Sequence, residues 1–191
     1  MTEFAKISID SAGKESEYIT TGIETIDENI GGLPLHCVIV IKGHKKPLRD
    51  SLLELYMSLQ TQYNDLCIWI RLKKFTCWDM LFKDIKEAVS CNKKIIILEV
   101  RCMAIPNIFA ADDVSRKLAE ELHKIVYETG IALILTKCFC NFLQIDKNGI
   151  DDIDNLAELI FREREDGMGF DCIKNRETSV MFGINFPKKY T

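Results

Sequence analysis

The chain has 191 residues, which is enough for one domain with a sizeable core. Hydrophobic residues make up 47% and charged residues 28%, a balance that excludes a mostly disordered chain. The 25 Lys and Arg against 29 Asp and Glu give a net charge of -4, which argues against a strongly basic nucleic-acid-binding protein. No apolar run approaches the roughly 18 residues that span a membrane, and the polar N-terminus contains no secretory signal. We therefore expect a soluble intracellular protein, cytoplasmic or, in a eukaryote, nuclear.

Four continuous apolar runs predict strands that are buried on both faces. Between them, three stretches have apolar residues at every third or fourth position and predict helices. Alternation of strand and helix at this spacing predicts right-handed crossovers and a three-layer α/β fold, with a mainly parallel sheet flanked by helices. The strand runs are Cys37–Lys42, Leu66–Leu72, Lys94–Val100 and Ile131–Lys137, and the helical stretches are Asp50–Gln62, Trp78–Ser90 and Asp112–Thr129.

After Asp151, the alternation of apolar runs and helical stretches gives way to shorter apolar segments. The segments LAELIFRERE, FDCIKNRE and VMFGINF read as shorter strands, with a turn at Asp166-Gly167, so we expect antiparallel strands at the C-terminal end of the sheet. Residues 1–17 are predicted to be a flexible segment, and residues 18–191 a single domain.

Eight cysteines are spread along the chain without a CxxC pair, and only three histidines accompany them. The closest pair is Cys138 and Cys140, whereas zinc sites usually need two close ligand pairs. Several cysteines fall inside apolar strands, where a free thiol behaves as a small hydrophobic group. We therefore predict buried, reduced thiols that form neither a metal site nor disulfides.

The segment that follows the first predicted strand is the candidate phosphate site, because ligands of open parallel sheets collect at the carboxyl ends of strands. A phosphate-binding loop reads GxxxxGK[ST]. Gly43 fills its first position, but Leu48, Arg49 and Asp50 replace the second Gly, the Lys and the hydroxyl residue. Leu48 crowds the loop, and Asp50 opposes phosphate by about 4 kcal/mol per charge pair at about 4 Å. The pattern also fits a plain polar turn. The candidate site comprises Gly43, Lys45, Lys46, Leu48, Arg49, Asp50 and Ser51.

Several motifs in the correct order resemble the RecA/KaiC/DnaB group of ATPases over residues 18–187. Before the first core strand, Thr21-Gly22, Asp27 and Gly31-Gly32 resemble the TG-x-x-x-LD-x-x-x-GG segment of that group. Residues 114–137 resemble the DnaB stretch that runs through a helix into a strand. Two further features carry the resemblance: Glu99 where the Walker B acid stands, and Lys174-Asn175-Arg176 where a Lys-x-Arg motif reaches the nucleotide of a neighbouring subunit.

The resemblance implies a RecA-like fold, but the chain departs from the group where chemistry is required. The group's catalytic carboxylate follows the second core strand, where this chain has Ile70-Arg71-Leu72-Lys73 and no acid. Without that acid, the water that attacks the γ-phosphate lacks its base. We therefore expect a pseudo-ATPase without a cofactor, binding ATP and magnesium only if its degenerate loop still permits this.

The first functional hypothesis is a non-catalytic subunit that assembles with homologous RecA-like subunits, as a hetero- or homo-oligomer, in DNA replication, recombination or repair. Lys174 and Arg176 then act in trans on the partner's nucleotide, or else they are ordinary surface charges. One alternative is a divergent but active ATPase. The other is a module that binds single-stranded DNA, in which basic residues lie beside aromatic residues that stack on bases, unless those aromatics pack in the core. The candidate DNA contacts are Arg71, Lys73, Lys74 and Lys137.

Overall fold

The computed structural model describes eight segments of the chain: residues 8–9, 15–16, 18–72, 77–99, 113–138, 152–166, 169–175 and 182–184. Within residues 1–17, these segments contain only β1 (Ser8–Ile9) and β2 (Glu15–Ser16), which pair antiparallel. The predicted flexible segment therefore lies largely outside the described residues.

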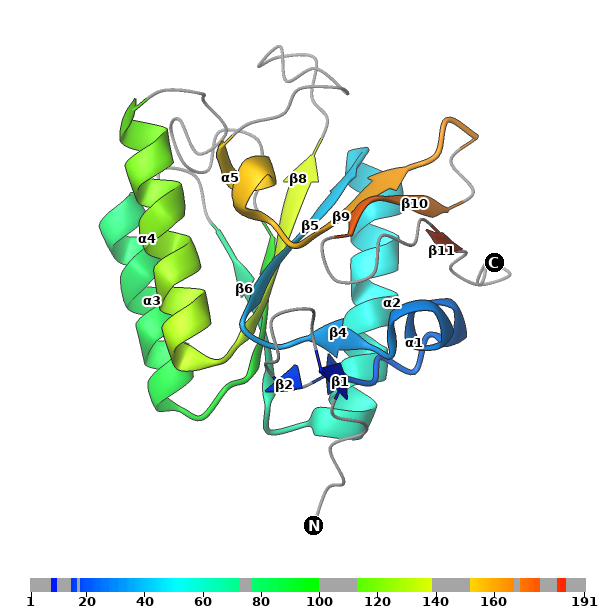
Figure 1. The fold of residues 1–191 in the computed structure, drawn as a ribbon, viewed down its shortest axis with the longest axis horizontal. Coiled ribbons are helices and arrows are strands. Elements are labelled where there is room, and N and C mark those ends of the chain that lie inside the picture. Colours follow the sequence, from blue (N-terminus) through cyan, green and yellow to red (C-terminus); the bar gives the residue numbers. More distant parts are fainter. Residues whose placement is uncertain are drawn as a thin grey trace.

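A seven-stranded sheet forms the centre of the molecule, with the order β11-β10-β9-β5-β8-β7-β6 (Figure 1). Its five strands from β9 to β6 are parallel, and β10 and β11 add antiparallel strands at one edge. The predicted mixed α/β fold with a mainly parallel sheet is thus confirmed. The strands are β5 (Cys37–Gly43), β6 (Cys67–Arg71), β7 (Ile95–Glu99), β8 (Ala132–Cys138), β9 (Leu159–Glu163), β10 (Phe170–Asn175) and β11 (Gly183–Ile184).

Helices cover both faces of this sheet. Figure 1 shows α3 and α4 on one side and α1 and α2 on the other, with the small helix α5 above the α4 side. No helix among the described residues is long and apolar enough to cross a membrane. The helices are α1 (Glu24–Ile30), α2 (Lys45–Tyr63), α3 (Trp78–Ser90), α4 (Asp113–Thr129) and α5 (Asp152–Leu156).

The continuous apolar strands are buried from both sides, as their sequence predicts. Along β5, Val38 and Val40 pack in the core under α3 and α4, whereas Ile39 and Ile41 pack in the core under α1 and α2. Successive side chains alternate between faces, so a strand that is covered twice must be apolar at every position.

The strand β6 departs from this expectation. It was predicted to be buried on both faces, but it is the edge strand of the sheet, and only Cys67 is fully buried along it. Ile68, Trp69 and Ile70 are partly exposed, and Arg71 is exposed. An apolar run identifies a strand, but it does not place the strand within the sheet.

Three further differences concern short or irregular elements. The helix α2 begins at Lys45, five positions before the predicted start at Asp50. The strand β9 is parallel to β5, although it was predicted among the antiparallel additions. The short helices α1 and α5 and the antiparallel pair β3 (Tyr18–Ile19) and β4 (Leu33–Pro34) were not predicted.

Candidate functional site

The residues predicted to handle a nucleotide lie at the carboxyl ends of the parallel strands. Gly43 ends β5, Arg71 ends β6 and Glu99 ends β7, and Lys137 lies one residue before the end of β8. The ends of parallel neighbours meet at one edge of the sheet, which is the upper edge in Figure 1. This edge is where ligands of open α/β sheets bind.

The helix α2 begins almost directly after β5, with only His44 between them. The Leu48 N–H donates to the His44 oxygen at 3.0 Å, which closes the first helical turn. Leu48, at the position of the second loop glycine, is therefore already inside the helix, where its side chain is buried against the sheet. Arg49 and Asp50 follow on the exposed side of the helix, and Ser51 is buried. Lys45 and Lys46 belong to the first turn, but their side chains lie outside the described residues.

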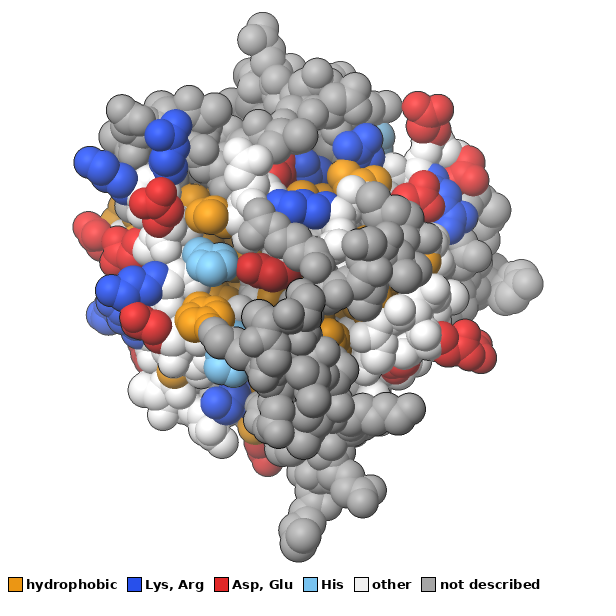
Figure 2. All heavy atoms as spheres, in the orientation of Figure 1, with side chains coloured by type: hydrophobic (Ala, Val, Ile, Leu, Met, Phe, Trp, Pro, Cys, Tyr) orange, Lys and Arg blue, Asp and Glu red, His pale blue; other side chains and the backbone are white. Residues whose placement is uncertain are grey.

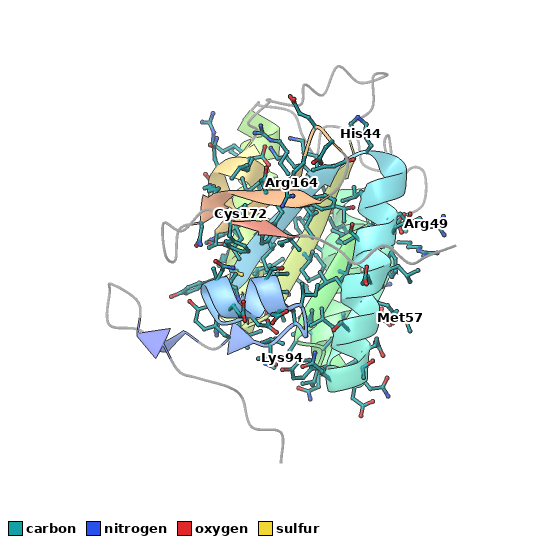
Figure 3. All side chains as sticks on the ribbon, turned by 90° about the vertical axis from the view of Figure 1, so that its right-hand side faces the viewer. His44, Arg49, Met57, Lys94, Arg164 and Cys172 are labelled. Atoms are coloured by element: carbon teal, nitrogen blue, oxygen red, sulfur yellow. The ribbon has the colours of Figure 1, made fainter. Side chains whose placement is uncertain are left out.

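A carboxylate from β9 lies at the N-terminus of α2. Glu163 Oε2 accepts a hydrogen bond from the His44 backbone N–H at 2.5 Å and lies 3.0 Å from His44 Nδ1. The Glu163 side chain is only 5% exposed, and Figure 3 shows His44 at the upper end of α2. A helix N-terminus favours negative charge because of its free N–H groups and its dipole. Here an acid of the chain itself supplies that charge.

This contact also accounts for the glycine that ends β5. A Cβ atom on Gly43 would lie 2.9 Å from Glu163 Oε2 and 3.2 Å from a ring carbon of Phe170. The first glycine of the candidate loop therefore makes room for the strand β9 and the side chain of Phe170.

Glu99, the candidate Walker B acid, forms an ion pair with the end of the neighbouring strand. Arg71 Nε lies 3.0 Å from Glu99 Oε2, and the Arg71 guanidinium lies 4.6 Å from the centre of the Trp69 ring. Arg71 occupies the strand end where the resemblance places a catalytic acid. The charge of Glu99 is thus offset by a cation instead of being joined by a second carboxylate.

Sequence reasoning missed a buried ionic cluster on the other face of the sheet. Lys42 Nζ lies 2.5 Å and Lys137 Nζ 3.2 Å from Asp154 Oδ2 of α5. All three residues are at most 2% exposed. Lys42 and Lys137 are register partners on β5 and β8, so their side chains share one face. The sequence did contain a signal for this cluster, because the apolar runs that form β5 and β8 both end in a lysine, and the two lysines are at the same register.

The cations that were predicted to contact DNA or a partner's nucleotide therefore lie in different surroundings. Lys137, predicted as a DNA contact, is buried beneath α5, because its ammonium group pairs with Asp154. Lys174, the candidate trans-acting residue, donates to the backbone oxygens of Asp154 at 2.6 Å and Asn155 at 3.0 Å. The remaining predicted cations, Lys73, Lys74 and Arg176, lie outside the described residues.

The motif before the first core strand is held together by a carboxylate. Asp27 accepts hydrogen bonds from the Thr21 N–H at 2.7 Å, the Thr21 hydroxyl at 2.9 Å and the Gly22 N–H at 2.8 Å. Gly32 has a φ of 120°, and a Cβ atom there would lie 2.4 Å from the Ile19 oxygen. The spacing that resembles the RecA/KaiC/DnaB group is thus explained locally by packing of β3, α1 and β4.

The five described cysteine side chains are free thiols. Cys37, Cys67 and Cys172 are buried, as predicted, whereas Cys77 and Cys91 are exposed, contrary to the prediction of buried thiols. Burial raises the pKa of the Cys67 thiol to about 12 and also raises the pKa of Cys172. In the same part of the chain, no three His, Cys, Asp or Glu side chains gather as a metal site would require.

No protein-family model matches the sequence, and no curated protein sequence is similar to it. Among solved structures, a KaiC-like protein of the hyperthermophilic archaeon Pyrococcus horikoshii OT3 aligns with a TM-score of 0.61 at 15% sequence identity. The alignment covers 90% of this chain and 100% of the archaeal chain. The chain has a KaiC-like RecA fold. At this identity the likeness concerns the fold alone, so function has to be argued from the site.

Proposed function

We propose that the chain is a non-catalytic RecA/KaiC-like subunit that assembles with an active RecA-like ATPase and regulates it in DNA replication, recombination or repair. The observation that carries the proposal is the Glu163 carboxylate on the backbone N–H of His44, at the N-terminus of α2. The homologous partner is inferred from the fold and from the sequence resemblance to the RecA/KaiC/DnaB group.

Phosphate binding in this fold requires a loop whose backbone N–H groups turn inward around the anion. In this chain, the Leu48 N–H is bonded within the helix and the His44 N–H is bonded to Glu163. A triphosphate near Glu163 would meet like charge, at about 4 kcal/mol for each pair of unit charges about 4 Å apart. Both features support a subunit that works without nucleotide of its own.

Hydrolysis would further require a base for the attacking water. The strand end that would carry it holds Arg71, which is paired with Glu99 at 3.0 Å. This pairing supports a subunit that does not hydrolyse ATP, and it weakens the alternative of a divergent active ATPase.

The single-stranded-DNA alternative has less support. Lys137 is buried, and Arg71 is engaged by Glu99 and Trp69. On the face shown in Figure 2, basic and acidic side chains are mixed over the α3 and α4 side of the molecule and form no one-sided basic surface there. A nucleic-acid groove would concentrate cations along one path.

The proposal also gives Lys174 and Arg176 a role in trans, at the partner's nucleotide. Lys174 already donates to two carbonyl oxygens of α5, so acting in trans would require it to exchange these bonds. Arg176→Ala is therefore the cleaner test of a trans-acting cation. We expect assembly with the partner to persist while the partner's ATP turnover falls, and unchanged turnover in an intact complex would reject this role.

The proposed function is tested on the native complex. The tagged full-length chain is purified from its natural source, co-purifying proteins are identified, and the purified pair is reconstituted. We expect a RecA-like subunit with an intact phosphate loop, and we expect its ATP turnover to change when this chain is added. A complex without such a subunit, or ATP turnover by this chain alone, would contradict the proposal.

A further inference from the structure

The strand β6 forms one edge of the seven-stranded sheet. The Leu72 N–H, directly after the strand, donates inward to the Glu99 oxygen at 3.2 Å. Backbone groups alternate in direction along a strand, so Trp69 and Arg71 direct their N–H and C=O groups away from β7. No strand or side chain among the described residues pairs with those groups. This open edge is a template for a further strand.

The side chains beside the open edge form a rigid platform. Trp69 is partly exposed and packs edge-on against Tyr56 of α2, with ring centres 5.4 Å apart. The Arg71 guanidinium covers the Trp69 ring at 4.6 Å, and the Arg71 side chain is 48% exposed. Side chains held by such ring contacts lose little freedom on binding, which favours their use in recognition.

A stripe of exposed residues on α2 runs along the same side. Arg49, Leu53 and Met57 follow at intervals of four, so they lie on one helix face. Leu53 is 43% and Met57 54% exposed, which is unusual for large apolar side chains. Gln60, on the next turn of the same face, reaches Cys67 of β6. Figure 3 shows Arg49 and Met57 on the side of α2 that faces away from β9 and β10.

The contact of Gln60 argues against a second copy of the chain paired symmetrically about Trp69. A symmetric pairing of β6 with a second copy, centred on Trp69, would use the outward backbone groups of both Cys67 and Arg71. The Cys67 oxygen is already taken, because Gln60 Nε2 donates to it at 3.1 Å. Among the described residues, nothing pairs with the part of the edge at Trp69 and Arg71. This favours a strand from a different protein that pairs with the carboxyl end of β6 and continues past it.

We propose that this edge binds an extended acidic segment of a partner protein as an added strand. The backbone of Trp69 and Arg71 would pair with that segment, its apolar side chains would cover Leu53 and Met57, and its acidic side chain would face Arg49. The exposed Arg49 has no acidic partner among the described residues, so an acidic side chain of the segment would form an ion pair with it. The inference rests on the proposed function only in taking the partner to be the active RecA-like subunit.

Selection of peptides on the purified full-length chain tests the proposal directly. The probe is a phage-displayed library of random ten-residue peptides, followed by anisotropy measurements on the enriched peptides. Met57→Glu should weaken their binding at least about tenfold, whereas the matched control Met80→Glu should change it less than about twofold. Met80 lies on α3 and is 55% exposed, against 54% for Met57, so both substitutions place a charge at equally exposed helical positions. Arg49→Glu should remove the preference for acidic peptides.

Amide hydrogen exchange then locates the added strand. The Trp69 and Arg71 N–H groups should exchange at least about tenfold more slowly with an enriched peptide bound. The proposal is overturned if no peptide is enriched, if Met57→Glu and Met80→Glu have equal effects, or if exchange at Trp69 and Arg71 is unchanged. ATP binding by this chain would contradict the proposed function and leave these results intact, so the two failures are distinguishable.

Discussion

Asp154 forms ion pairs with two buried lysine ammonium groups, and its side chain is 1% exposed. Removing one partner of a buried ionic cluster leaves uncompensated charge in the core and destabilises proteins by about 3–5 kcal/mol. We expect Asp154→Ala to lower the free energy of unfolding by that amount, measured by urea denaturation followed by circular dichroism.

The matched control for this substitution is Asp171→Ala. Asp171 also accepts from a cation, Arg164, at 2.8 Å, but its side chain is 55% exposed. Exposed ion pairs contribute only about 0–1 kcal/mol. Equal losses of stability in the two variants would show that the buried cluster is no more important than a surface pair.

The buried cysteines lead to a prediction about reactivity. Only the thiolate is nucleophilic, and burial raises the pKa of the Cys67 thiol to about 12, so Cys67 stays protonated at pH 8. We expect iodoacetamide at pH 8 to modify Cys77 and Cys91, which are exposed, well before Cys67 and Cys172. Peptide mass spectrometry of the native chain measures this order, and early labelling of Cys67 would mean that its strand opens easily.

The ionic cluster of Lys42, Lys137 and Asp154 is a feature that local sequence patterns could not predict. The apolar runs around Lys42 and Lys137 predicted both strands, but a lysine that ends a strand normally reaches solvent. Its burial depends on Asp154, which lies 112 positions beyond Lys42 in the sequence. A pairing of that length is invisible to local patterns.

At the scale of elements, the start of α2 was the most consequential wrong prediction. Pro47 lies in the segment predicted as a loop, and proline lacks the N–H that helix interiors need. In the first turn of a helix that N–H has no partner anyway, so α2 includes Pro47 and begins at Lys45. The candidate phosphate loop was therefore predicted at a place where the chain is already helical.

This helix start predicts the result of restoring the loop sequence. The triple variant Leu48→Gly, Arg49→Lys and Asp50→Thr should still fail to bind ATP, because Glu163 remains at the N-terminus of α2. It should also lose about 3–5 kcal/mol of stability, since Leu48 is 4% exposed in the core. Calorimetry and urea denaturation measure the two effects, with Arg49→Lys plus Asp50→Thr as the control that keeps Leu48. Micromolar binding by the triple variant would show that the loop sequence alone had removed the site.

Long, strongly patterned elements were predictable, and short ones were not. The helix α3 spans Trp78–Ser90 as predicted, because its apolar stripe packs against the sheet. The helix α5 has only five residues, which is too few for a periodic pattern. It lies just before the apolar strand β9, and the sequence of this region predicted a strand alone. Its position over the sheet is held by Asp154, which pairs with Lys42 and Lys137, and by Ile153, which packs in the core.

At the scale of the whole molecule, the mixed α/β fold with a mainly parallel sheet followed from the alternation of apolar strands and amphipathic helices and from the resemblance to the RecA/KaiC/DnaB group. The candidate site did not, because it combines distant parts of the chain: His44 and Glu163 are 119 positions apart. The sequence predicted a phosphate loop with substituted residues. The fold adds a carboxylate, that of Glu163, at the N-terminus of α2.

The central claim is that this carboxylate leaves no place for a nucleotide. Isothermal titration of the full-length chain with ATP and magnesium tests it most directly, with Glu163→Gln as a companion variant that keeps the shape of the side chain and removes its charge. We predict no binding heat for the wild-type chain, corresponding to a Kd weaker than about 1 mM. A micromolar Kd for the wild-type chain would contradict the account.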